Sequence, residues 1–363
     1  MKRAYNFNPG PAILPLPVLQ EASQGILEIG GSGMSILEVS HRGGHYEAIH
    51  FEARDRLLKL LGLKAEEASV LFLGGGASVQ FAMVPMNFLP AGKTADYVVG
   101  GEFGAKAASE AKKVGSVNVA ASSEADKHAR LPRGLHWTPQ AAYAHVTSNN
   151  TIEGTQFQAL PADTGSPLVL DATSEFLSKP VDFSRVGLVY AGAQKNLGPA
   201  GLTVCVLRKD FLATAREDIP AILSYKAHAK ADSLFNTPPV FAVYMFNLVL
   251  KWLEAQGGLE GIRKVNERKA ALVYQALDEF PDFYDPAVTE KADRSKMNVT
   301  FRLKGGDKEK DKEFLAKAEA RNLVGLKGHR SVGGFRASIY NAFPEEGCQA
   351  LAAFLRDYAQ GRA

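Results

Sequence analysis

The amino-acid sequence predicts an α/β protein, in which a large domain with a mostly parallel sheet is joined to a smaller C-terminal α/β domain. Short apolar runs alternate with loops and helical stretches, which is the pattern of a parallel sheet wrapped by helices. The 363 residues, 46% hydrophobic and 22% charged, suffice for a sizeable core and for more than one domain. The pattern of elements changes at about Gly257, which separates the two expected domains.

The first part of the chain begins with an arm and continues into alternating strands and helices. Residues 6–17 are rich in Pro, Gly and Asn, which predicts an extended arm instead of a helix. Beyond it we expect helices at 16–27 and 79–89, and strands at 69–73, 96–99, 141–148, 168–171, 188–191 and 202–207. We place the large domain at residues 16–256.

The second part of the chain is expected to be mainly helical. Pro238 and Pro239 predict the start of a long helix that runs to Trp252. From about Gly257 the pattern predicts a helix at 259–277, a strand at 297–303, a helix after the charged stretch 304–313, and a last helix after Pro344. We assign residues 257–363, together with the arm at 1–15, to the small domain, and we interpret the charges at 307–313 as a solvated helix start.

Composition excludes several classes of function. The 42 basic and 39 acidic residues are interspersed, with a formal net charge of +3, so we expect neither a nucleic-acid partner nor a membrane surface. Cys205 and Cys348 match no metal or redox spacing and indicate a reducing compartment, which predicts a cytoplasmic protein without a metal site. No export signal or membrane span is expected.

The strongest candidate for chemistry is Lys195, in the stretch 187–201, which reads Gly-Leu-Val-Tyr-Ala-Gly-Ala-Gln-Lys-Asn-Leu-Gly-Pro-Ala-Gly. A buried strand would end just before Lys195, next to the polar amide of Gln194, and the Asn, Gly and Pro that follow predict a turn. Asp171 ends the preceding apolar strand. Most lysines are simply solvated, but a strand-end lysine beside a strand-end aspartate is what a pyridoxal phosphate (PLP) enzyme needs. The amine forms a Schiff base with the cofactor aldehyde and moves protons, and the carboxylate partners the pyridinium nitrogen.

At this point a resemblance to a known family can be stated. The segment Ala-Gly-Ala-Gln-Lys-Asn with Gly-Pro-Ala-Gly closely resembles the lysine segment of phosphoserine aminotransferases, and the arm sequence Asn-Phe-Asn-Pro-Gly-Pro-Ala is similar to the way these enzymes begin. The resemblance implies the PLP-dependent transferase fold (aspartate aminotransferase-like, fold type I), with a seven-stranded sheet in the large domain. It also implies a homodimer with shared active sites.

The resemblance assigns further cofactor-binding residues. A glycine run, 74–76, precedes a helix and predicts a phosphate cradle, although a tight turn would explain it too. It matches neither a nucleotide P-loop nor a dinucleotide fingerprint. In the family, Ala77 and Ser78 bind the cofactor phosphate, Phe103 replaces a tryptophan that stacks on the ring, and Thr151, in Asn-Asn-Thr-Ile, contacts the cofactor. The pair Asn236 and Thr237 would reach the partner subunit's cofactor, while helix capping is the ordinary explanation of Thr237.

Two groups of cationic residues are candidate substrate ligands. His41 and Arg42 lie in a glycine-flanked loop that could hold a dianion, or could be merely solvated. His329, Arg330 and Arg336 lie in a glycine-rich segment that leads into a strand, and a buried guanidinium there needs an anion. The resemblance implies that Arg336 binds the substrate α-carboxylate. The other four would bind the distal phosphate or carboxylate, with His41 and Arg42 supplied by the partner subunit.

The expected activity is therefore the interconversion of 3-phosphohydroxypyruvate and L-glutamate with O-phospho-L-serine and 2-oxoglutarate, in L-serine biosynthesis, by a ping-pong mechanism. A second activity on 4-phosphohydroxy-L-threonine, in pyridoxine biosynthesis, would use the same anion ligands. The nearest alternative is another fold-type I aminotransferase, such as a serine–glyoxylate enzyme. A cysteine desulfurase would need a reactive cysteine on a mobile loop. A non-catalytic binding protein would not need Lys195 beside Asp171.

Overall fold

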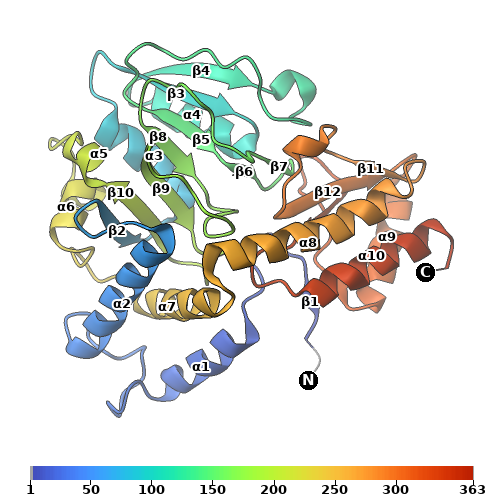
Figure 1. The fold of residues 1–363 in the computed structure, drawn as a ribbon, viewed down its shortest axis with the longest axis horizontal. Coiled ribbons are helices and arrows are strands. Elements are labelled where there is room, and N and C mark those ends of the chain that lie inside the picture. The colour runs from blue at the N-terminus through green and yellow to red at the C-terminus, as the bar shows by residue number, and fades with distance from the viewer. Residues whose placement is uncertain (1–2, 363) are drawn as a thin grey trace.

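The large part of the molecule is built on a seven-stranded sheet with the order β2-β10-β9-β8-β5-β3-β4 (Figure 1). The computed structural model describes residues 3–362. All neighbouring strands of this sheet are parallel except β10, which runs antiparallel to both β2 and β9. The strands are β2 (Ala68–Leu73), β3 (Thr94–Val99), β4 (Ser116–Ser122), β5 (Ala144–Thr147), β8 (Leu168–Asp171), β9 (Val186–Gly192) and β10 (Thr203–Arg208). The predicted α/β class with a mostly parallel sheet is confirmed.

Helices cover both faces of this sheet, which explains why its central strands are apolar on both sides. In β9, Val189 and Ala191 pack into one core, while Leu188 and Tyr190 pack into the other. The first core includes α2 (Gly44–Leu61) and α7 (Val240–Ala255), with α1 (Leu16–Leu27) packed beside α7 (Figure 1). The second core includes α3 (Gly76–Phe88), α4 (Glu102–Lys112), α5 (Lys209–Ala213) and α6 (Tyr225–Lys230).

The C-terminal part of the chain forms a third core, around a three-stranded antiparallel sheet. Its strands, in the order β11-β12-β14, are β11 (Tyr284–Pro286), β12 (Asn298–Leu303) and β14 (Phe335–Ser338). Its helices are α8 (Gly258–Asp278), α9 (Lys308–Ala320) and α10 (Glu345–Ala359). The N-terminal arm belongs with this core, because β1 (Tyr5–Asn6) pairs in parallel with β13 (Leu323–Val324) and Phe7 and Ile13 are buried in it.

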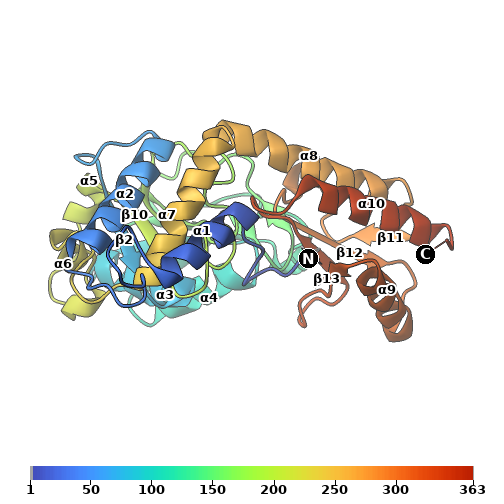
Figure 2. The same cartoon turned by 90° about the horizontal axis from the view of Figure 1, so that it is seen from below.

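Helix α8 joins the two parts of the molecule (Figures 1 and 2). Its first turns bury Leu259 and Ile262 in a core of the large part, whereas its later turns bury Val273 and Leu277 in the C-terminal core. The remaining elements are short: the hairpin strands β6 (Asn149–Asn150) and β7 (Thr155–Gln156), and the 3-10 helices Glu124–Asp126, Ala221–Leu223 and Lys291–Asp293.

Most predicted elements occur close to their expected positions, but several were not foreseen. Helices α2 and α4 and strand β4 had no prediction. Helix α3 begins at Gly76, three residues earlier than expected, because Gly75 adopts a left-handed conformation (φ 86°) that turns the chain directly into the helix. No helix within residues 3–362 has the length and apolar character that a membrane crossing requires. Over the same residues, no cluster of three or more His, Cys, Asp or Glu side chains could hold a metal ion.

Candidate active site

The predicted catalytic residues meet at the carboxyl edge of the large sheet. Strand β8 ends at Asp171, and β9 ends three residues before Lys195. Strand β5 ends four residues before Thr151, and Phe103 lies in the first turn of α4, directly after β3. Because parallel strands bring their carboxyl ends to one edge of a sheet, these four side chains converge where open α/β sheets bind ligands.

The amine of Lys195 is held by Thr151 and lies near an aromatic ring. Its Nζ donates a hydrogen bond of 2.6 Å to Oγ1 of Thr151 and lies 5.0 Å from the centre of the Phe103 ring. Burial lowers the pKa of Lys195 to about 8, and the charge of Arg336 acts in the same direction, while Asp171 opposes it. About a tenth of this amine is therefore neutral, and so nucleophilic, at pH 7.

The turn that carries Lys195 is fixed by contacts from three directions. The side chain of Asn196 donates to the carbonyl of Phe176 (2.7 Å) and accepts from the backbone N–H of Asn341 (2.9 Å), in the C-terminal part of the chain. The backbone oxygen of Gln194 accepts from the N–H of Ala12 in the arm (2.9 Å). Gly10 approaches so closely that a Cβ there would lie 3.2 Å from Cγ of Lys195. These contacts position the amine.

Asp171 is a buried carboxyl group beside this amine. Only 3% of the residue is exposed, and Oδ1 accepts a hydrogen bond from the N–H of Thr173 (3.0 Å). Burial raises the pKa of Asp171, while hydrogen bonding to Thr173 and the charge of Lys195 lower it. In the protein alone, burial thus favours the neutral acid. The ionised form expected from the sequence would require a cation close to the carboxyl group, such as a protonated ring nitrogen.

The glycine run forms an open turn at the amino end of α3. Gly74 and Gly75 are exposed, and a Cβ at Gly74 or Gly76 would meet nothing within 4 Å. A Cβ at Gly75 would lie 2.2 Å from Cγ2 of Val79, so this position requires glycine. The free N–H groups and the helix dipole suit an anion at this end of α3, where Ala77 is half-buried and Ser78 is exposed.

Asn236 and Thr237 are exposed and line a cavity together with Gly74 and Gly75 of the same chain. The structure removes one ordinary explanation of Thr237, because α7 begins at Val240 without a side-chain cap. The predicted contact of this pair with a partner subunit stays a prediction.

Arg336 is the buried cation of the site. It lies in β14 and is 5% exposed, and its Nη1 donates to the backbone oxygen of Thr151 (3.2 Å). Its Nε is buried without a hydrogen-bond partner among residues 3–362. Burial lowers the pKa of Arg336, while Glu153 and Tyr340 oppose this shift. A desolvated guanidinium with an unused N–H is ready to bind a carboxylate.

The loop before β14 brings His329 against the large part of the molecule. Nδ1 of His329 lies 2.7 Å from Oγ of Ser331, and this hydroxyl donates to Oε2 of Glu102, in the first turn of α4 (3.3 Å). Burial lowers the pKa of the half-buried His329. Arg330, its neighbour, is exposed.

His41 and Arg42 lie in the segment before α2. His41 is half-buried and Arg42 is exposed. Within residues 3–362, no hydrogen bond or ion pair joins either of them to Lys195, Asp171, or Arg336. The role of His41 and Arg42 as substrate ligands, and their contribution from a partner subunit, stay predictions.

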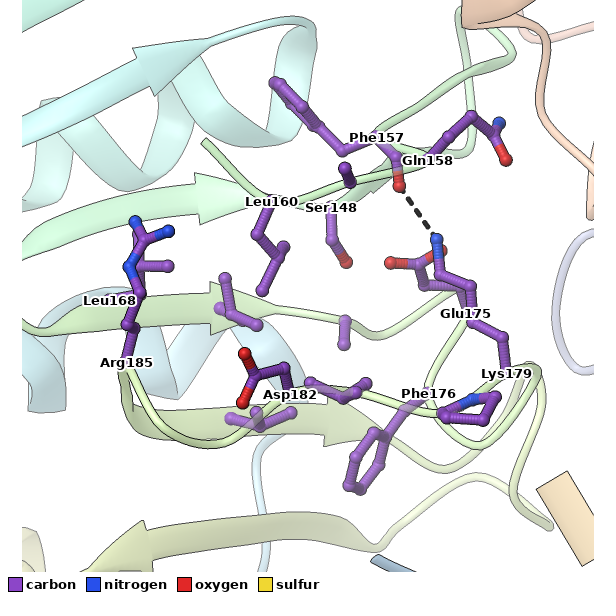
Figure 3. A pocket seen from close by; sticks show the side chains of 16 residues that line it. Ser148, Phe157, Gln158, Leu160, Leu168, Glu175, Phe176, Lys179, Asp182 and Arg185 are labelled. Carbon is purple, nitrogen blue, oxygen red and sulfur yellow. Dashed lines mark hydrogen bonds and ion pairs between the residues drawn. The ribbon is translucent and has the colours of Figure 1, made fainter. Parts of the chain in front are cut away.

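Sequence reasoning missed Glu153 and Asn341. Glu153 lies two residues after Thr151, where a carboxylate in a turn is usually exposed. Only the structure shows that this one is buried (7% exposed). Asn341 matters because it binds Asn196 from 145 positions away, which no local pattern could reveal. The sequence also gave no sign of a cavity over Leu168, Leu170 and Val189, with Glu175, Lys179, Asp182 and Arg185 among its lining residues (Figure 3). This cavity contains none of the predicted site residues.

Comparison with known proteins identifies the family. Residues 4–351 match the family model described as aminotransferase class-V. A phosphoserine aminotransferase of Niallia circulans is 53% identical over 99% of both chains. The structure superposes on phosphoserine aminotransferase from Bacillus circulans subsp. alkalophilus with a TM-score of 0.96, at 51% identity and with both chains fully covered. PLP-bound phosphoserine aminotransferase from Trichomonas vaginalis gives a TM-score of 0.92 at 38% identity, covering 98% of this chain and 100% of that one. The chain therefore belongs to the class-V aminotransferases and, within them, to the phosphoserine aminotransferase family.

Proposed function

We propose that this protein is a PLP-dependent transaminase that interconverts 3-phosphohydroxypyruvate and L-glutamate with O-phospho-L-serine and 2-oxoglutarate, as its relatives' names imply. The observation that carries the proposal is the placement of the Lys195 amine and the Asp171 carboxyl group at adjacent strand ends. The same chain offers a buried cation, Arg336, for a substrate carboxylate. An aminotransferase needs all three groups.

The residues present fit PLP. A partly neutral amine can bond to the cofactor aldehyde, and Phe103 offers a ring face close to that amine. Asp171 would partner the ring nitrogen, because a protonated nitrogen would favour the ionised carboxylate that burial otherwise disfavours. The open turn at Gly74–Gly76 suits the phosphate, with Ser78 and, from either subunit, Asn236 and Thr237 as further donors. Gln194, which precedes Lys195 in the chain, is a further candidate for a polar contact with the cofactor.

When bound, PLP supplies an electron sink that makes the substrate α-proton acidic. Lys195 then acts as the base that removes this proton and returns it, and its lowered pKa suits both steps near neutral pH. Thr151 holds the amine through Oγ1 and holds Arg336 through its backbone oxygen, so one residue sets the distance between base and carboxylate site. Asp171 keeps the ring nitrogen cationic.

The distal end of the substrate must be bound by His41, Arg42, His329 and Arg330. No hydrogen bond joins His41 or Arg42 to Lys195 within residues 3–362, and we propose a homodimer in which the partner subunit supplies these two residues. Exposed apolar side chains support a second copy, because Leu16, Ile26 and Leu27 on α1 and Met34 and Leu37 after it are at least 40% exposed.

We make four further proposals, which concern the metabolic role, the location in the cell, a second substrate and the division into domains. The enzyme acts in L-serine biosynthesis in the cytoplasm, and it accepts 4-phosphohydroxy-L-threonine as a second substrate in pyridoxine biosynthesis. The chain divides into a large domain (16–256) and a small domain (1–15 and 257–363), because the arm and the C-terminal elements share one core. The alternative, a serine–glyoxylate type of aminotransferase, would not need four cationic residues for the distal end of its substrate.

The deciding experiment uses the two half-reactions. The protein reconstituted with PLP should be yellow, and borohydride should fix the cofactor covalently to the peptide that contains Lys195. Glutamate and then O-phospho-L-serine should each change the cofactor spectrum. Arg42→Ala should weaken the binding of both amino acids without bleaching the cofactor. A colourless protein, or a Lys195→Ala variant that still turns over, would refute the proposed function.

A further inference from the structure

Glu153 is a buried carboxyl group with no role in the function proposed above. It is 7% exposed, and its Oε1 accepts a hydrogen bond from the backbone N–H of Glu102 at the start of α4 (2.8 Å). Its Oε2 is buried and has no hydrogen-bond partner among residues 3–362. Gly101 makes room for it, because a Cβ there would lie 2.5 Å from Oε2. In its ionised form, a carboxyl group in this condition needs a positive charge nearby.

Arg336 supplies that charge. Glu153 and Arg336 line the same cavity, and each influences the pKa of the other in the direction expected for opposite charges. They form no ion pair, since no nitrogen–oxygen distance between them is within 4.0 Å. Instead, Oε2 of Glu153 and Nε of Arg336 both remain buried and unpartnered. The pair is therefore a charge interaction across a gap, not a closed salt bridge.

Other charged and titratable groups also lie around Glu153 and the cavity that it shares with Arg336. Burial is the largest cause of the raised pKa of Glu153. The hydrogen bond from the N–H of Glu102 lowers this pKa, while the negative charge of the Glu102 side chain raises it. The charge of Glu153 in turn raises the pKa of Lys195. The walls of the shared cavity add Asp126, Lys127, His128, Arg302 and His329. Among the charges that act on Glu153, that of the buried Arg336 lowers its pKa.

We propose that Glu153 is the resident counter-charge of Arg336, a positioning residue that attracts the guanidinium through its charge when no substrate is bound and competes with the substrate α-carboxylate. The proposal rests on the proposed function, in which Arg336 binds this carboxylate. Every substrate of the reaction carries an α-carboxylate, so the competition affects the amino acids and the oxo acids alike. Glu153 thereby weakens ground-state binding and keeps product release fast.

Removal of this charge has a predictable sign. Glu153→Gln keeps an oxygen that can accept from the N–H of Glu102 but removes the negative charge. Because one charge interaction in a partly desolvated site changes an equilibrium by about tenfold, 2-oxoglutarate should bind about tenfold more tightly to the variant at neutral pH. The KM for glutamate should fall by a similar factor, while kcat should not rise.

The pH dependence gives a second signature. Burial raises the pKa of Glu153, so protonation removes its charge as the pH falls through that value, and binding of the carboxylate should tighten in the wild type. In Glu153→Gln this part of the pH profile should be absent. The histidines His128 and His329 titrate in both proteins, so the difference between the two profiles isolates Glu153.

The test is a calorimetric titration of the PLP-loaded protein with 2-oxoglutarate from about pH 5 to about pH 8, together with steady-state kinetics. Glu153→Asp keeps the charge and should keep the acid limb of the profile. Glu175→Gln is the matched control, because Glu175 is equally buried (7% exposed) but lines the other cavity, near Lys179 (Figure 3), and this variant should bind like the wild type. Unchanged or weaker binding by Glu153→Gln, or an unchanged pH profile, would overturn the proposal. A wild type without transaminase activity would instead refute the proposed function.

Discussion

The hydrogen bond between Lys195 and Thr151 gives the sharpest test of how the site tunes its amine. In the wild type, burial lowers the pKa of Lys195 to about 8, and Oγ1 of Thr151 accepts a hydrogen bond of 2.6 Å from Nζ. This bond favours the ammonium form. Thr151→Val keeps the shape of the side chain and removes the acceptor. Since a hydrogen bond to a charged group contributes about 1.5–3 kcal/mol, and one pKa unit corresponds to about 1.4 kcal/mol, the pKa of Lys195 should fall by about one to two units.

The assay is the rate at which the cofactor-free protein combines with PLP, measured by absorbance as a function of pH. Only the neutral amine attacks the aldehyde, so the rate should rise with pH through about 8 in the wild type and through a lower value in Thr151→Val. Thr151→Ser retains the hydroxyl group and should follow the wild type. If Thr151→Val left the inflection in place or moved it to higher pH, the hydrogen bond would not control this amine.

Three other substitutions test separate parts of the site. Gly75→Ala should lower the free energy of unfolding by about 1–3 kcal/mol in urea, because alanine is strained at φ 86° and its Cβ would collide with Val79, whereas Gly74→Ala should be tolerated. Phe103→Trp should slow PLP loss on dialysis by a few-fold to about tenfold, since indole offers a larger stacking face. Arg336→Lys should raise the KM for glutamate and for 2-oxoglutarate by about tenfold or more, because lysine cannot bind a carboxylate with two parallel hydrogen bonds.

Each of these expectations has a clear contrary result. Equal stability of the Gly75 and Gly74 variants would remove the argument from backbone conformation. Faster PLP loss from Phe103→Trp would mean that the pocket is shaped for the smaller ring. A KM change for only one of the two dicarboxylates would show that Arg336 does not bind the α-carboxylate that they share.

The sequence predicted correctly that Asp171 and Lys195 lie at the ends of two neighbouring strands, because the signal was local. Asp171 and Lys195 each follow a continuous apolar run, and a run buried on both faces is the clearest mark of a central strand. Helices α2 and α4 gave no such signal, since α2 is rich in charges and the buried face of α4 consists of Gly104 and three alanines. The reversed direction of β10 was readable in principle, because about ten residues without a helix separate it from β9, too few for a usual parallel crossover.

What the sequence could not predict are contacts between distant segments, and these explain how the parts of the molecule meet at the amine. Lys195 is held by Thr151 from the turn between β6 and β7, and the turn that carries Lys195 is held by Ala12 from the arm and Asn341 from the C-terminal part. Arg336, also from the C-terminal part, binds Thr151 itself. Arg336 and Lys195 are therefore connected through a single residue, Thr151, which binds Arg336 through its backbone oxygen and Lys195 through its hydroxyl group. A carboxylate that binds at Arg336 acts on the residue that holds the base. The substrate's charged end and the proton-transfer group are thus coupled through Thr151, so Thr151→Val should alter the pH profile of catalysis as well as that of cofactor binding.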